Sequence, residues 1–165
     1  MANVEIALPE EQTSVPHVAR TTVAALASLL VARALRMPEA YWATITTIVV
    51  MQSSLGAAWK ASRQRFAGTA LGAIVGGLLA SYFGSNLFAF TAAVLGTGLI
   101  CVALRLDRTA FRFAGITVAI IMLVARQSSA WIIAAHRFVE VSLGIAVALI
   151  LTAVWPEGPP TTASR

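Results

Sequence analysis

The sequence contains few charged residues and almost no cysteine. Only 12% of its 165 residues are charged, whereas 58% are hydrophobic; a soluble domain carries about 25% charged residues. The mean hydropathy is correspondingly high, at +0.80. A single cysteine, Cys101, excludes a disulfide framework and a cysteine-based metal cluster. These shortages indicate an integral membrane protein with one domain.

Signatures of the common enzyme classes are also missing. The sequence has no nucleophile elbow, no HExxH pair and no P-loop, and Asp107 is its only aspartate. We therefore expect no enzymatic activity, no catalytic residues, no cofactor and no bound metal. Residues 1–16 are acidic and lack the features of a signal peptide, so we expect a tail there. Residues 156–165 are rich in proline and polar side chains, which is typical of a disordered tail.

Long runs without charge define the expected helices. The uncharged run 66–104 holds 39 residues, which would form a helix about 58 Å long. The hydrocarbon core of a bilayer is only about 30 Å thick, so this run must turn back once, and GSN at 84–86 suits a turn. The same reasoning predicts a transmembrane domain over 17–155. Its six helices are expected at about 18–36, 40–57, 62–83, 87–104, 111–126 and 131–155.

Basic residues are distributed unequally between the two expected membrane faces. One face receives Arg20, Lys60, Arg63, Arg65, Arg105, Arg108 and Arg112, and the other receives Arg33, Arg36 and Arg126. The positive-inside rule then predicts a multi-pass protein with both termini in the cytoplasm. Contact with anionic lipid explains the net charge of +5, so the lipid bilayer is an expected partner and nucleic acid is not.

An internal repeat relates the two halves of the chain. The matching segments are ITTIVVM (45–51) with ITVAIIM (116–122), QSS (52–54) with QSS (127–129), and WKASRQRFAGTALG (59–72) with WIIAAHRFVEVSLG (131–144). Each copy holds three expected helices, at about 18–83 and 87–155, and an odd number turns the second copy upside down in the membrane. The predicted fold is therefore an all-α integral membrane protein, with six transmembrane helices arranged as two inverted three-helix repeats.

Charged residues inside a predicted membrane helix are candidates for function. Arg137 and Glu140 are three positions apart, so they share one helix face and can pair. Two interpretations stay open: an ion pair that fixes the helix, or a substrate-binding Arg137 beside a proton-binding Glu140. In the first repeat Gly68 stands where Glu140 stands in the second, so the halves match in frame but differ in charge.

Polar and small residues complete the candidate set. The two QSS segments favour interrupted helices at matching positions, which predicts substrate contacts, although such residues also join helices. The predicted substrate contacts are Gln52, Ser53, Ser54, Gln127 and Ser128. The predicted helix-packing residues are Gly68, Gly72, Gly76 and Gly144, with a partner in the same chain or in a second subunit. Tyr41, Trp42 and Trp59 are expected at the membrane interfaces, and stacking on an aromatic ligand is the alternative.

Residues 41–80 resemble the fusaric acid resistance and aromatic acid exporter superfamily. The resemblance is carried by an aromatic pair followed by Gln52, Gly56, Arg65, Gly68, Thr69 and Gly72, and it extends over about 20–155. It implies a bacterial inner-membrane exporter of aromatic or other weak carboxylic acids, driven by the proton gradient. In that interpretation Arg65 and Arg137 attract the carboxylate of a small-molecule substrate and Glu140 couples transport to protons.

The resemblance also bears on assembly. Large family members carry two such membrane units and a soluble region, whereas this sequence holds one unit. A homodimer or higher homo-oligomer is therefore expected. A non-transporting membrane subunit or scaffold, and a small oligomeric channel, are the alternatives.

Overall fold

The computed structural model describes residues 14–124 and 128–156. These residues form six helices and no strand, which confirms the all-α prediction. The helices are α1 (Val15–Ala34), α2 (Tyr41–Val50), α3 (Leu55–Phe83), α4 (Leu87–Ala103), α5 (Arg108–Leu123) and α6 (Ala130–Val154). By length and composition α1, α3 and α6 can cross a membrane, and α2 and α4 are shorter apolar helices. Most of the two predicted tails lies outside the described residues, as do Arg126 and Gln127.

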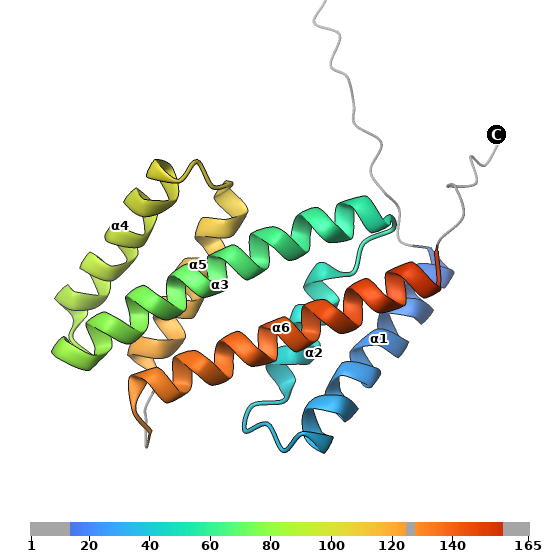
Figure 1. The fold of residues 1–165 in the computed structure, drawn as a ribbon, viewed down its shortest axis with the longest axis horizontal. Helices are drawn as coiled ribbons and strands as arrows, with labels where there is room; N and C mark the ends of the chain where they lie inside the picture. The colour runs from blue at the N-terminus through green and yellow to red at the C-terminus, as the bar shows by residue number, and fades with distance from the viewer. Residues whose placement is uncertain (1–13, 125–127, 157–165) are drawn as a thin grey trace, which may run out of the picture.

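Two long helices form the middle of the molecule. α3 and α6 lie side by side and run in opposite directions (Figure 1). α2 packs along α6 with α1 outside it, and α5 packs along α3 with α4 outside it. The 29 residues of α3 span about 43 Å. That length exceeds the roughly 30 Å hydrocarbon core of a bilayer, so α3 is tilted or extends beyond the core.

Small side chains dominate the interior. Thirteen of the 21 buried apolar residues in the described chain are alanine, and none is leucine. Large apolar side chains instead cover the outside; Leu87, Phe88 and Val102 are 70%, 85% and 76% exposed. A soluble protein buries such residues, whereas helices in lipid approach one another through small residues. The distribution is therefore that of a membrane protein.

The structure corrects the boundary between the second and third predicted helices. α2 ends at Val50, residues 51–54 are not helical, and α3 already begins at Leu55. The Ser54 side chain accepts a hydrogen bond from the backbone N–H of Ala57 at 3.3 Å, and such a cap fixes the first turn of a helix. The predicted loop at about 58–61 is therefore wrong, because these residues, which include Lys60, lie on α3.

The predicted turn at 84–86 is present. Gly84 has a φ of 61°, in the left-handed region that suits glycine. The side chain of Asn86 then accepts a hydrogen bond from the N–H of Phe88 at 2.8 Å and caps α4. The two residues reverse the chain between α3 and α4.

Candidate functional site

Two buried arginines from different helices lie against one face of α2. Arg137 of α6 holds its guanidinium carbon 3.6 Å from the ring centroid of Trp42. Arg65 of α3 donates from Nη2 to the hydroxyl of Thr46 at 3.2 Å. Trp42 and Thr46 are four positions apart, so they lie one turn apart on the same face of α2. α2 therefore brings two positive charges from α3 and α6 close together inside the bundle.

The two guanidinium groups keep unused hydrogen-bond donors. Arg65 and Arg137 are 4% and 1% exposed. Nε of Arg65, and both Nε and Nη1 of Arg137, are buried without a hydrogen-bond partner. No carboxylate of residues 14–124 or 128–156 forms an ion pair with either group. Because buried charged donors require partners, this part of the interior can attract an anion.

Glu140 is buried one turn from Arg137 on α6. Its Oε1 accepts a hydrogen bond from the backbone N–H of Glu39 at 3.1 Å, just before the start of α2. Its Oε2 is buried without a partner. A carboxylate at this place also interacts favourably with the helix dipole of α2. The direct ion pair that the spacing of Arg137 and Glu140 suggested is not formed, because each side chain contacts the beginning of α2 instead.

The two QSS segments do not lie together. Gln52 is near the end of α6, since its carbonyl and that of Trp155 both accept hydrogen bonds from Arg20. Ser128 lies beside Ser129, which caps the start of α6. The 25 residues of α6 separate the two by about 36 Å. A single substrate site lined by Gln52, Ser53, Ser54 and Ser128 is therefore inconsistent with this arrangement, and Gln127 lies outside the described residues.

The predicted packing glycines lie at the closest helix contacts. A methyl group on Gly68 would overlap the carbonyl oxygen of Ala110, and one on Gly72 would overlap that of Ala114. Gly76 faces α5 as well. Gly144 lies in the same way against the carbonyl oxygen of Ala43 in α2. The partner of the α3 stripe is thus α5 of the same chain.

Sequence reasoning missed the contacts that Trp42, Thr46 and Arg20 make with other helices. Trp42 was expected at a membrane interface, but it is half-buried beneath Arg137. The spacing of four residues between Trp42 and Thr46 could have indicated that they share one face of a helix. Arg20 was expected among the basic residues of the cytoplasmic face, yet it is fully buried within α1 and donates hydrogen bonds to the carbonyls of Gln52, just after α2, and Trp155, just after α6.

The sequence matches a known protein family. The model of the family described as "Fusaric acid resistance protein-like" matches residues 25–151. The chain belongs to this family. The fusaric acid resistance protein-like match confirms the resemblance seen in the sequence and identifies a membrane transporter family.

Two curated proteins similar to this chain carry the name "Uncharacterized transporter YdhK", one from Escherichia coli (strain K12) and one from Escherichia coli O157:H7. Each is 31% identical over 153 residues, which are 87% of this chain and 23% of the relative. The chain therefore spans about a quarter of the length of these relatives. No solved structure matches it significantly.

Proposed function

We propose that this chain is the membrane unit of an exporter of aromatic or other weak carboxylic acids. The buried guanidinium groups of Arg65 and Arg137 would bind the substrate carboxylate, and Glu140 would couple its movement to protons. The observation that carries the proposal is the pair of buried arginines, from α3 and α6, that contact α2 and keep unused donors. Charged hydrogen bonds from arginine are the usual means of binding a carboxylate in a water-poor site.

The aromatic rings at the site support an aromatic substrate. Arg137 lies over Trp42, and the guanidinium carbon of Arg65 lies 4.3 Å from the ring centroid of Phe113 in α5. Both charges are thus embedded among flat apolar surfaces. An aromatic acid offers a carboxylate for the arginines and a ring that can pack on such surfaces.

We further propose that α1–α3 and α4–α6 are inverted repeats that cross the membrane six times. Equivalent contacts in the two halves support this arrangement. Gly144 meets Ala43 and Thr46 of α2, as Gly72 meets Ala114 and Thr117 of α5. Each of these three residues in one half has its counterpart 71 or 72 positions away in the other.

The arginine contacts follow the same frame. Arg137 over Trp42 corresponds to Arg65 over Phe113. The rings of Phe66 and Phe138, themselves 72 positions apart, pack against each other with centroids 5.0 Å apart. A residue that touches its own counterpart lies at a two-fold axis. The match is imperfect at one pair of equivalent positions, where the first half has glycine, Gly68, and the second half has a carboxylate, Glu140.

The proposal includes a bacterial inner-membrane location, cytoplasmic termini and a homo-oligomer. Exposed basic residues support the orientation: Lys60, Arg63, Arg105, Arg108 and Arg112 lie toward the expected cytoplasmic face, against Arg33 and Arg36 toward the other. Arg20 and Arg65 no longer count toward this bias because they are buried.

The test is ligand binding and flux with the full chain. We expect a panel of aromatic acids, including benzoate, to raise the thermal midpoint of the detergent-solubilised protein. Arg137→Gln and Arg65→Gln should each weaken binding at least tenfold, because a charged hydrogen bond contributes about 1.5–3 kcal/mol. Arg112→Gln is the matched control, since Arg112 is exposed on α5. Equal binding by all variants would refute the arginine site.

Glu140→Gln separates binding from coupling. In proteoliposomes with an imposed pH gradient, we expect this variant to bind the acid but to lose pH-driven flux above that of empty liposomes. Equal pH-driven flux in wild type and Glu140→Gln would rule out the proton role. Absence of binding by any acid would favour a non-transporting subunit instead.

A further inference from the structure

We propose that the chain binds an anionic phospholipid at the junction of α3 with the α4–α5 connection. The headgroup phosphate would occupy a basic cavity and an acyl chain would follow an apolar groove between α4 and α5. This site is separate from the buried arginines, and its occupancy does not depend on transport activity.

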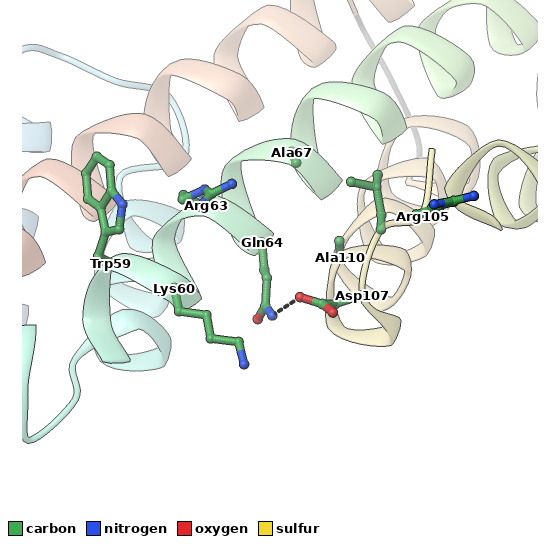
Figure 2. Close-up of a pocket in the computed structure, with 9 residues that line it drawn as sticks. Trp59, Lys60, Arg63, Gln64, Ala67, Arg105, Asp107 and Ala110 are labelled. Atoms are coloured by element: carbon green, nitrogen blue, oxygen red, sulfur yellow. Dashed lines mark hydrogen bonds between the residues drawn. The ribbon is translucent and has the colours of Figure 1, made fainter. Parts of the chain in front are cut away.

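The headgroup cavity has an excess of positive charge. It has a volume of about 500 Å³ and is lined by Trp59, Lys60, Arg63, Gln64, Ala67, Arg105, Leu106, Asp107 and Ala110. In Figure 2 the residues of α3 lie on one side and Arg105, Asp107 and Ala110 on the other. Asp107 is the one acid among three cations, and its Oδ2 already accepts a hydrogen bond from Gln64 at 2.5 Å. The lining therefore keeps an excess of positive charge that a phosphate can neutralise.

An apolar groove continues from this cavity. It has a volume of about 590 Å³ and is lined by Phe90, Thr91, Val94, Leu95, Gly98, Leu99, Cys101, Val102, Leu106, Arg108 and Phe111. Leu106 lines both the groove and the basic cavity. From Phe90 to Val102 the groove follows α4 for about 18 Å. Half of a bilayer core is about 15 Å thick, so the groove matches the depth of an acyl chain in one leaflet.

The combination favours a lipid over a free anion. A soluble phosphate or carboxylate would need only the basic cavity, whereas the adjoining groove offers its apolar surface to a hydrocarbon chain. Trp59 is 56% exposed beside the basic residues, and indole rings prefer the headgroup level of a membrane. Lysine and arginine near the surface attract anionic lipid. The basic cavity, the apolar groove and the exposed indole of Trp59 are all consistent with binding of an anionic phospholipid.

Arg105 offers a clean substitution for testing the site. Its φ is 52°, in the left-handed region, where it ends α4 with a hydrogen bond from the N–H of Leu106 to the carbonyl of Cys101. Glycine suits this conformation better than arginine, so Arg105→Gly removes the charge without straining the fold. Arg36 provides a matched control: its φ is 54°, it follows α1 in the same way, and it lines neither cavity.

The experiment measures lipid binding by the full chain in detergent, with native mass spectrometry and titration of added lipid. We expect wild type to bind phosphatidylglycerol at least tenfold more tightly than phosphatidylcholine. Arg105→Gly should weaken phosphatidylglycerol binding about fivefold, the factor that corresponds to about 1 kcal/mol per surface cation. Arg36→Gly should bind it as wild type does.

Two further arms distinguish the headgroup from the chain. Glycerol 3-phosphate, which has the phosphate without the acyl chains, should fail to displace phosphatidylglycerol at equal concentration. Leu99→Trp, which fills the groove, should weaken binding, whereas Ile150→Trp on exposed α6 surface should not. Equal binding of the two lipids, equal effects of Arg105→Gly and Arg36→Gly, or displacement by glycerol 3-phosphate would each overturn the proposal.

Discussion

Adding one methyl group at Gly144 should separate α6 from α2. The Cβ of an alanine there would overlap the carbonyl oxygen of Ala43 and lie 2.8 Å from Cβ of Thr46. Neither neighbour can turn away, because one is backbone and the other is a β-branched side chain fixed on α2. The two helices must therefore move apart over the length of their contact.

The magnitude follows from two losses. Overpacking of a tight interior contact costs about 1–3 kcal/mol. The hydroxyl of Thr47 also shares its single proton between the carbonyls of Ala43 at 2.9 Å and Gly144 at 3.0 Å, and losing the second acceptor adds at most about 1 kcal/mol. For a chain of this length, 1 kcal/mol corresponds to about 2–4 °C in thermal midpoint. Gly144→Ala should therefore lower the midpoint by several degrees.

The assay is thermal unfolding of the detergent-solubilised protein. Gly96→Ala and Gly115→Ala are matched controls, because both positions are within helices and a Cβ at either has no neighbour within 4 Å. Alanine is the better helix former by about 1 kcal/mol, so the controls should be unchanged or slightly stabilised. A midpoint for Gly144→Ala equal to those of the controls would refute the close approach of α2 and α6.

Two further substitutions test the contacts around α2. Trp42→Leu removes the ring beneath Arg137, a contact worth about 0.5–2 kcal/mol. We expect this variant to have a lower thermal midpoint than wild type, and Trp42→Phe to lie between the two. Equal midpoints for the two variants would argue against the ring contact. Ser54→Ala removes the cap of α3 and should cost about 1 kcal/mol, measured by thermal unfolding, whereas Ser53→Ala, which caps no helix, should behave as wild type.

The apolar runs predicted the number of helices but not all of their ends. The turn at Gly84 was readable because glycine and asparagine interrupt a run too long for one span. The end of α2 at Val50 was not, since residues 51–54 are as uncharged as the helix before them. A tertiary contact holds the segment that follows α2, because Arg20 donates a hydrogen bond to the carbonyl of Gln52.

The candidate site was predicted in its residues more than in its contacts. Arg65, Arg137 and Glu140 stand out in sequence because charge is costly in a membrane helix. Spacing along α6 suggested that Arg137 pairs with Glu140, but spacing carries no information about a third helix. The beginning of α2 packs against both side chains and offers the ring of Trp42 and, just before the helix, the N–H of Glu39 instead. The QSS segments were expected to line one site, but Gln52 and Ser128 lie near opposite ends of α6, and sequence spacing does not show this separation.

The contact between Phe66 and Phe138 has an evolutionary consequence. If the proposed duplication occurred, an ancestral three-helix chain had to assemble as an antiparallel pair, with each phenylalanine touching the same residue of the other copy. In that ancestor every substitution appeared twice, on both sides of the axis. Fusion into one chain removed this constraint, and a single carboxylate at Glu140 opposite Gly68 is a change that only the fused chain could acquire.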